Sequence, residues 1–346
     1  MKRKYFAAGL LILAGLVSWA VAPIPELSRN GFAMNTLIRI SAHTTDESII
    51  DDAYSLLHEL DHRLSMYNPS SDISRVNSLA GTHSVNVSPH TLEAVRDSLR
   101  LYEATNGVFN VLIGPVTRLW KINAAEKSVP SPESLNAAIA LTDITNLELG
   151  DSSILLKTKG CVIDLGGMAK GYASGKIAAL LKSKGVTSGL VDLGGNIYTI
   201  GTKPDGENWK IGVRDPLSPA GTPALAVSVN DCAVVTSGGY ERFKVVDGKR
   251  YSHFFDPKTG ESVMSDVLSA TLVTPDGSLA DGLATAFMIS GVDKAAGMLA
   301  KISPMPGAIF IREGQDKQLE IIATENLKDS VIMARYPVKF INPHRL

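Results

Sequence analysis

An aspartate and a threonine four residues apart, Asp281 and Thr285, form the pair with the clearest chemical potential in this sequence. Residues four apart in a helix lie on one face. A carboxylate and a hydroxyl placed in this way can share a hard cation such as Mg²⁺, which takes oxygen ligands. The alternative is an aspartate near a helix N-terminus that stabilises the helix dipole, and for an isolated motif this is the commoner situation.

A glycine-rich turn, Asp164-Leu-Gly-Gly-Met-Ala-Lys-Gly171, lies between an expected strand and an expected helix. Glycines let the backbone approach a ligand, and the amides at a helix start favour a phosphate group. Lys170 adds a positive charge, and Asp164 can accept a hydrogen bond from a ring N–H. The spacing is not that of a Walker motif. A tight strand-to-helix turn with a solvated lysine is the alternative.

A histidine, His253, comes at the end of an expected strand, before the turn Asp256-Pro-Lys-Thr-Gly260. A neutral imidazole there can act as a general base. A structural histidine is the alternative. The other histidines lack the spacing of zinc ligands, and the chain has no Gly-x-Ser-x-Gly elbow, so neither a zinc site nor a serine hydrolase is expected.

The composition excludes several classes of protein. Among 346 residues, 34 Lys and Arg balance 35 Asp and Glu, so the net charge of −1 gives no electrostatic footprint for nucleic acid. Hydrophobic residues make up 45%, as in a globular core. Cys161 and Cys232 are too few for a disulfide scaffold, and the sequence leaves open whether they pair.

The N-terminus indicates export. Lys2, Arg3 and Lys4 precede an apolar run, Tyr5–Ala22, which is the pattern of a signal peptide. The run of roughly 18 residues is also marginally long enough for an uncleaved membrane anchor. Residues 1–25 are therefore expected to be a signal peptide or anchor. Residues 26–346 are expected to be periplasmic or attached to the outer face of the inner membrane.

The periodicity of apolar residues predicts a mixed α+β protein. Two-residue spacing predicts a strand over 34–41, and spacing of three and four predicts a helix over 46–64. Ser88 and Ser131 each precede a proline, as at a helix N-terminus. A helix over 279–302 is expected to be interrupted at Ser290-Gly291. Further strands are expected over residues 153–164, 188–200, 208–214, 224–230, 232–236, 242–255, 267–274, 308–312 and 318–324.

The order of the motifs along the chain is more specific than any one of them. They are Met34-x-Thr36, Leu64–Asn77, Gly107–Trp120, 164–173, Val191–Gly195, Trp209–Pro216, Thr236–Tyr240, Ser252–Gly260 and Ala280–Thr285. Together they resemble the FAD:protein FMN transferase (ApbE-type) family from about residue 33 to 300. The resemblance implies, over 26–346, a single two-lobed α+β domain with mixed sheets flanked by helices and an FAD cleft between the lobes.

The resemblance also implies roles for individual residues. It gives an enzyme that uses Mg²⁺ to move FMN from FAD to a Ser or Thr of an exported partner protein, such as a membrane redox subunit, releasing AMP. His253 would be the base or orienter of the hydroxyl. The implied FAD contacts are Met34, Tyr67, Val108, Phe109, Asn110, Asp164, Lys170 and Phe255. The implied Mg²⁺ ligands are Asp281, Thr285 and carbonyl oxygens of Gly167 and Ala284, with Asp281 also counted as catalytic.

Two stretches depart from the family pattern. Phe109-Asn110-Val111-Leu112 stands where the family usually has Phe-Asp-Pro-Thr, which loses a carboxylate and a threonine near the flavin, and Gly175 stands where the family usually has an aspartate. Both changes remove charge near the expected site, and neither touches Asp281 or Thr285. Two alternatives to transfer therefore stay open: hydrolysis of FAD to FMN and AMP, and a carrier that binds FAD without turnover.

Overall fold

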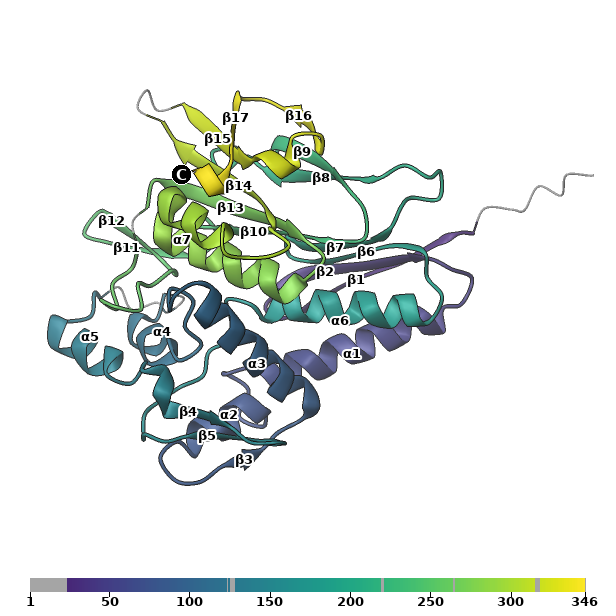
Figure 1. Ribbon diagram of the computed structural model, residues 1–346. Coiled ribbons are helices and arrows are strands. Elements are labelled where there is room, and N and C mark those ends of the chain that lie inside the picture. The colour runs from purple at the N-terminus through teal and green to yellow at the C-terminus, as the bar shows by residue number, and fades with distance from the viewer. Residues whose placement is uncertain are drawn as a thin grey trace, which may run out of the picture.

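The computed structural model describes residues 24–345, except for 123, 125–127, 219–220, 264 and 315–317 (Figure 1). Most of the predicted signal peptide or anchor, residues 1–23, lies outside the described residues. Within the described ranges, the structure contains no helix with the length and apolarity needed to cross a membrane.

A nine-stranded sheet forms the centre of the molecule, in the order β1-β2-β6-β7-β10-β13-β14-β15-β17. All neighbours pair antiparallel except β15 and β17. The strands are β1 (Glu26–Ala33), β2 (Thr36–His43), β6 (Ser188–Leu193), β7 (Asn196–Gly201), β10 (Ala233–Gly238), β13 (Val267–Thr274), β14 (Gly307–Glu313), β15 (Leu319–Thr324) and β17 (Val338–Ile341).

Helices α1, α3, α6 and α7 lie together below the sheet in Figure 1, and their apolar residues join the main hydrophobic core. Serine side chains cap α3 and α5 from the residue before proline, as the sequence predicts. The helices are α1 (Ser48–Leu64), α2 (Asp72–Ser78), α3 (Pro89–Ala104), α4 (Gly114–Trp120), α5 (Pro132–Ile139), α6 (Ala169–Ser183) and α7 (Gly277–Leu299), with short 3₁₀ turns at Ile144–Asn146, Glu325–Leu327 and Pro343–Arg345.

Smaller elements complete the two ends of the molecule. A sheet in the order β16-β9-β8 packs on the other face of the central sheet and closes a second core. A small third core joins α4 and α5 to Phe255. The remaining strands are β3 (Val85–Asn86), β4 (Leu147–Leu149), β5 (Ser153–Leu156), β8 (Trp209–Arg214), β9 (Pro223–Val229), β11 (Phe243–Val246), β12 (Lys249–Ser252) and β16 (Val331–Ala334).

The predicted α+β class is confirmed, and the predicted interruption of the last helix is present at Gly291, where φ is 75°. Some boundaries were wrong. The strand expected from Met34 begins at Thr36, because Met34 and Asn35 form the β1–β2 turn with φ of 49° and 59°. The strand expected over 188–200 is divided by the turn at 194–195.

The strand pair expected over 153–164 was wrong for its second half. The side chain of Asn77 replaces a strand partner there, donating to the Ile163 carbonyl at 3.0 Å and accepting from its amide at 2.7 Å. The strand expected over 242–255 is a hairpin, because the chain turns at Asp247-Gly248 with φ of 50° and 76°. Cys161 and Cys232 are both buried and free, so they do not pair.

Candidate active site

A cleft of about 290 Å³ lies between the start of α6, helix α7, the end of β10 and the β11–β12 hairpin. Most of the side chains singled out from the sequence meet there although they come from distant parts of the chain. The predicted residues that line it are Tyr67, Val108, Phe109, Asn110, Asp164, Gly167, Lys170, His253, Phe255, Asp281 and Thr285.

One side of the cleft, the helical wall, is lined by Gly166, Gly167 and Lys170 of the glycine-rich turn and by Asp281 and Thr285 of α7. Helices α6 and α7 touch here backbone to backbone. A Cβ atom on Gly171 would overlap the Gly277 carbonyl oxygen, and one on Gly277 would overlap that of Gly171. The sequence assigned Gly171 to close approach of a ligand, but its lack of a side chain serves the contact between the helices.

The close contact of the helices fixes the Asp281 carboxyl group. The amide of Gly171 donates to Asp281 Oδ2 at 2.9 Å, and the residue is only 2% exposed. Burial raises the pKa of Asp281, whereas the Lys170 ammonium, the amides of Gly171 and Lys170 and the nearby Asn196 side chain oppose that rise. The carboxylate is therefore held in place beside a positive charge, in a setting that favours a bound cation.

Asp281, Thr285 and Gly167 present three kinds of oxygen in one small region. Thr285 Oγ1 donates to the Gly167 carbonyl oxygen at 3.0 Å, which brings the turn and α7 together. Carboxylate, hydroxyl and carbonyl oxygens are hard ligands that suit Mg²⁺. Among the described residues no group of three or more His, Cys, Asp or Glu side chains could hold a metal ion. Any metal here would depend on this mixed set of oxygens.

Two predicted residues do not line the cleft. Ala284 lies inside α7 with its side chain fully buried. Met34 lies in the β1–β2 turn, where its amide donates to Asp61 Oδ2 at 3.0 Å. The neighbouring Thr36 packs against Gly194, which does line the cleft. The roles of Met34 and Ala284 stay predictions.

His253 lies on the opposite side of the cleft, after β12. Its Nδ1 is 3.0 Å from the carbonyl oxygen of Arg242, so Nδ1 carries the proton and Nε2 is the acceptor nitrogen. Burial lowers the pKa of His253 to about 4, and the positive charges of Arg242 and Lys170 act in the same direction. At neutral pH the imidazole is neutral and able to take up a proton.

Asp164 and Asn110 are held by hydrogen bonds to neighbouring segments. Asp164 accepts from the Gly166 amide at 2.8 Å and from Thr117 Oγ1 at 2.9 Å. Asn110 donates to the Thr142 carbonyl oxygen at 2.9 Å, and its Oδ1 accepts from an amide two residues on. The neutral side chain thus has a structural role as well as a place in the lining.

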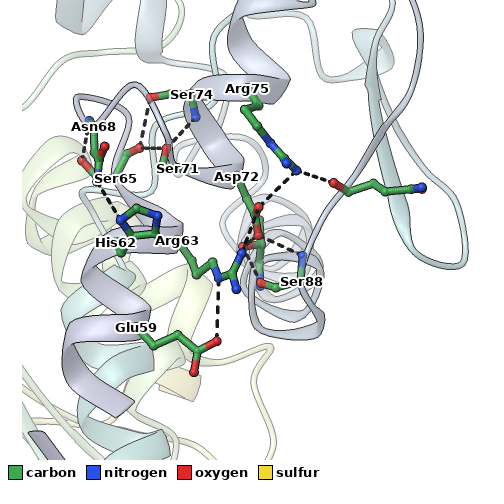
Figure 2. A network of polar contacts seen from close by, with 12 residues as sticks. Glu59, His62, Arg63, Ser65, Asn68, Ser71, Asp72, Ser74, Arg75 and Ser88 are labelled. Atoms are coloured by element: carbon green, nitrogen blue, oxygen red, sulfur yellow. Dashed lines mark hydrogen bonds and ion pairs between the residues drawn. The ribbon is translucent and has the colours of Figure 1, made fainter. Parts of the chain in front are cut away.

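Tyr67 lines the cleft and is 76% exposed, on a loop whose backbone is held by hydrogen bonds. Figure 2 shows the polar network of this loop, which connects Ser65, Asn68 and Ser71. Ser65 Oγ accepts from the amides of Tyr67 and Asn68, both at 3.1 Å, and Asn68 Nδ2 is 2.9 Å from His62 Nδ1. The backbone that carries the ring is therefore held in place, while the residue itself stays largely exposed.

The same network extends to Asp72, which lies almost fully buried at the start of α2 (Figure 2). Its carboxylate accepts from the Ser88 amide and the Thr91 hydroxyl, both at 2.9 Å, and it pairs with Arg63 and Arg75. Burial raises the pKa of Asp72, but these hydrogen bonds and Arg63 outweigh it, so the pKa is lowered. The charged carboxylate connects α1, α2 and α3 behind the Tyr67 loop.

The second side of the cleft, the hairpin wall, is lined by residues after α4 and by residues on either side of the β11–β12 hairpin. These are Lys121, Ile122, Ala124, Glu241, Arg242, His253, Phe254, Phe255 and Pro257. Phe255 stacks on Trp120, with ring centroids 5.8 Å apart. Lys244 of β11 is only 6% exposed and donates to the carbonyl oxygens of Trp120, at 2.7 Å, and Ser128. Its ammonium thus fastens the hairpin to the segment after α4.

Several residues of this wall were not predicted from the sequence. Glu241 and Arg242 line the cleft, and burial raises the pKa of Glu241 although Lys170 and Arg242 oppose the rise. Both follow the glycines at 238–239, and this proximity was the only feature of the sequence that could have placed them in the site. Lys244 could not have been found, because nothing in the sequence shows that this lysine is buried.

Known proteins of one family match this chain both in sequence and in structure. A model of the ApbE family matches residues 34–310. The FAD:protein FMN transferase of Treponema pallidum (strain Nichols) is 34% identical, over 89% of this chain and 91% of that protein. The one of Vibrio cholerae serotype O1 is 30% identical, over 88% of this chain and 92% of that protein. The structure of the flavin transferase ApbE from Vibrio cholerae matches with a TM-score of 0.80 at 29% identity, covering 89% of this chain and 100% of that one.

Proposed function

The chain belongs to the ApbE family, and we propose that it is an FAD:protein FMN transferase that forms a phosphoester between FMN and a Ser or Thr of an exported protein. One observation carries the proposal: the cleft brings together oxygen ligands, a positive charge and a neutral base. The oxygens belong to Asp281, Thr285 and Gly167, the charge to Lys170 and the base to His253. A pyrophosphate needs such a set of charges, and a hydroxyl nucleophile needs such a base.

The reaction breaks the phosphoanhydride bond of FAD and forms a phosphoester bond. The acceptor hydroxyl oxygen bonds to the FMN phosphorus, and the bond from that phosphorus to the bridging oxygen breaks, so that AMP leaves with the bridging oxygen. The hydroxyl proton goes to His253 Nε2, since Nδ1 is bonded to the Arg242 carbonyl. Lys170 lies where it can bind negative charge on the pyrophosphate.

Magnesium fits the oxygens of the helical wall. Asp281, Thr285 and the Gly167 carbonyl would hold it, and bound Mg²⁺ neutralises charge on the phosphates. The Thr285 hydroxyl donates a hydrogen bond to the Gly167 carbonyl oxygen, so the lone pairs of the hydroxyl oxygen remain available to a cation. The main-chain amides of Gly171 and Lys170 keep the Asp281 carboxylate in place independently of the ion.

The predicted N-terminal signal or anchor supports a location outside the cytoplasm, in the periplasm or on the outer face of the inner membrane. The proposed partner is accordingly an exported or membrane-bound redox subunit with a flavinylation site. The departures at Asn110 and Gly175 do not remove any group used in the proposed reaction. A Cβ on Gly175 would approach no atom more closely than the Gly277 nitrogen, at 4.0 Å.

The test is to incubate the full-length chain with FAD, Mg²⁺ and a candidate acceptor, and then to measure the intact mass of the acceptor and the release of AMP. A mass increase equal to covalent FMN, with AMP, is the expected result. FMN and AMP with an unmodified acceptor, across several acceptors, would instead identify a hydrolase. Intact bound FAD would identify a carrier.

A further inference from the structure

A buried amide lies in the cleft without a hydrogen-bond partner. Asn196, the first residue of β7, is 1% exposed and lines the cleft. Its Nδ2 atom has no hydrogen-bond partner among the described residues. A buried N–H group left unpaired costs about 1–3 kcal/mol. Few buried polar groups in native proteins lack a partner, and each calls for an explanation. Among the unpartnered buried side chains of the described residues, Asn196 is the one that lines the cleft, where a ligand supplies a partner.

The position of Asn196 in the sheet explains why its amide faces the cleft. The chain turns at Gly194 and Gly195, with φ of 67° and 90°, and the Asp192 carboxylate accepts from the Gly195 amide at 2.9 Å. Asn196 then pairs with Val235 of β10. Tyr198 and Ile200 follow at two-residue spacing and belong to the main core. Asn196 therefore takes a place on the helix-covered face that an apolar residue would otherwise fill.

The groups around Asn196 indicate the chemistry of the ligand. Its side chain lies close enough to Asp281 to act on the carboxylate, but it does not complete a hydrogen bond to it. Lys170 faces the same carboxylate, and Gly167 and Thr285 complete the lining nearby. A neutral N–H donor beside a cationic ammonium and a cation-binding set of oxygens suits an anionic oxygen of a phosphate group.

We propose that the side-chain amide of Asn196 binds a pyrophosphate oxygen of the nucleotide substrate. The proposal rests on the proposed function for the identity of the substrate, but the binding step can be measured without turnover. Asn196 acts here as a substrate-binding residue. It donates one hydrogen bond that neither Lys170 nor the glycine amides supply.

The test compares the wild-type full-length chain with Asn196→Leu and Asn196→Asp. Dissociation constants for FAD and ADP are measured in EDTA, so that metal-dependent turnover does not consume the substrate. We expect Asn196→Leu to weaken both ligands about 10- to 100-fold, as for loss of a hydrogen bond to a charged group. Asn196→Asp places a negative charge against the phosphate and is expected to weaken them further.

Stability provides the second readout. Leucine has the same number and branching of side-chain heavy atoms as asparagine and removes the unpaired amide, so Asn196→Leu is expected to raise the melting temperature of the ligand-free chain while weakening ligand binding. Ser188→Ala is the matched control. Ser188 is also buried with an unpartnered hydroxyl but is not among the residues that line the cleft, so ligand binding is expected to stay unchanged.

The outcomes separate this inference from the proposed function. FAD and ADP affinities of Asn196→Leu within twofold of wild type would overturn the inference, as would a melting temperature that falls while binding is retained. If wild type binds both ligands and Asn196→Leu does not, but no acceptor receives FMN, the inference holds and the transferase proposal fails. A wild-type chain that binds neither ligand, both in EDTA and with added Mg²⁺, would refute both.

Discussion

The two walls of the cleft are built in different ways. The helical wall belongs to the main core, and its reactive groups are fixed by contact between the backbones of α6 and α7 at Gly171 and Gly277. The hairpin wall rests on a small core around Trp120 and is fastened by polar bonds from Lys244. A dense core tolerates little displacement, whereas a few polar bonds can be loosened without unfolding the protein.

Because the two walls are held differently, we expect them to contribute differently to turnover and to ligand affinity. The helical wall carries the oxygens and the positive charge that the proposed phosphoryl transfer needs in accurate positions. The hairpin wall and the Tyr67 loop carry aromatic rings at the cleft, and of the polar groups in the hairpin wall the proposed reaction uses only His253. Substitutions in the helical wall should therefore act on turnover, and those in the hairpin wall and the Tyr67 loop mainly on affinity.

The largest effect is expected for Asp281→Ala. Removing the carboxylate takes away several kcal/mol of charge stabilisation, so Mg²⁺-dependent AMP release should fall at least about 10³-fold. Asp293→Ala, on an exposed part of the same helix, serves as the control and should retain activity. Undiminished activity of Asp281→Ala at saturating Mg²⁺ would show that Asp281 is not a required Mg²⁺ ligand. It would also contradict the expectation that the helical wall governs turnover.

The second-largest effect is expected for His253→Ala, because His253 is the one residue of the hairpin wall to which the proposed reaction gives a role in turnover. Loss of a general base should lower kcat about 10²-fold or more, with little change in the KM for FAD. Steady-state kinetics of AMP release measures both parameters, and His83→Ala, at an exposed position, is the control. A rise in KM with kcat unchanged would make His253 a binding residue. The hairpin wall would then affect affinity alone, and the helical wall alone would affect turnover.

The pH dependence follows from the environment of His253. Its pKa is about 4 rather than 6.5 because the imidazole is buried beside positive charges. The neutral, base-competent form therefore persists well below neutral pH. We expect no loss of kcat between pH 7 and 5.5 from this group, and a loss approaching tenfold per pH unit below about pH 4. A limb in the kcat profile near pH 6.5 that disappears in His253→Ala would contradict this expectation.

Tyr67→Ala tests the Tyr67 loop. If the exposed ring stacks on the flavin, its loss should weaken FAD binding by about 1–3 kcal/mol. Fluorescence titration with FAD measures the change. Tyr67→Phe keeps the ring and should bind FAD as wild type does. Equal affinities of the alanine variant and wild type would place Tyr67 outside the binding site.

The smallest effect is expected for Lys244→Met. Methionine keeps the buried stem but leaves the carbonyls of Trp120 and Ser128 without this donor, so the hairpin wall should loosen. We expect the KM for FAD to rise about three- to tenfold with kcat nearly unchanged. Lys339→Met, on an exposed part of β17, is the control. A matching fall in kcat would show that the hairpin wall also positions the reacting groups.

Much of the site could be predicted because the chemistry lies in short motifs. The glycine-rich turn and the Asp281–Thr285 pair were recognisable from local spacing, and the structure brings them together. The expected elements were mostly found, because serine caps and apolar periodicity act over a few residues. Errors arose where distant groups decide the local structure, as where Asn77 replaces a strand partner of Ile163.

The sequence by itself determined the α+β class, the turns, and the inventory of carboxylate, hydroxyl, amine and imidazole groups. Tertiary structure alone decided that Gly171 serves the contact with α7, that Lys244 is buried against Trp120, and that the Asn196 amide remains unpaired in the cleft. The reason is that local preferences act over a few bonds. Burial and hydrogen-bond partners depend instead on which remote segments the core brings together.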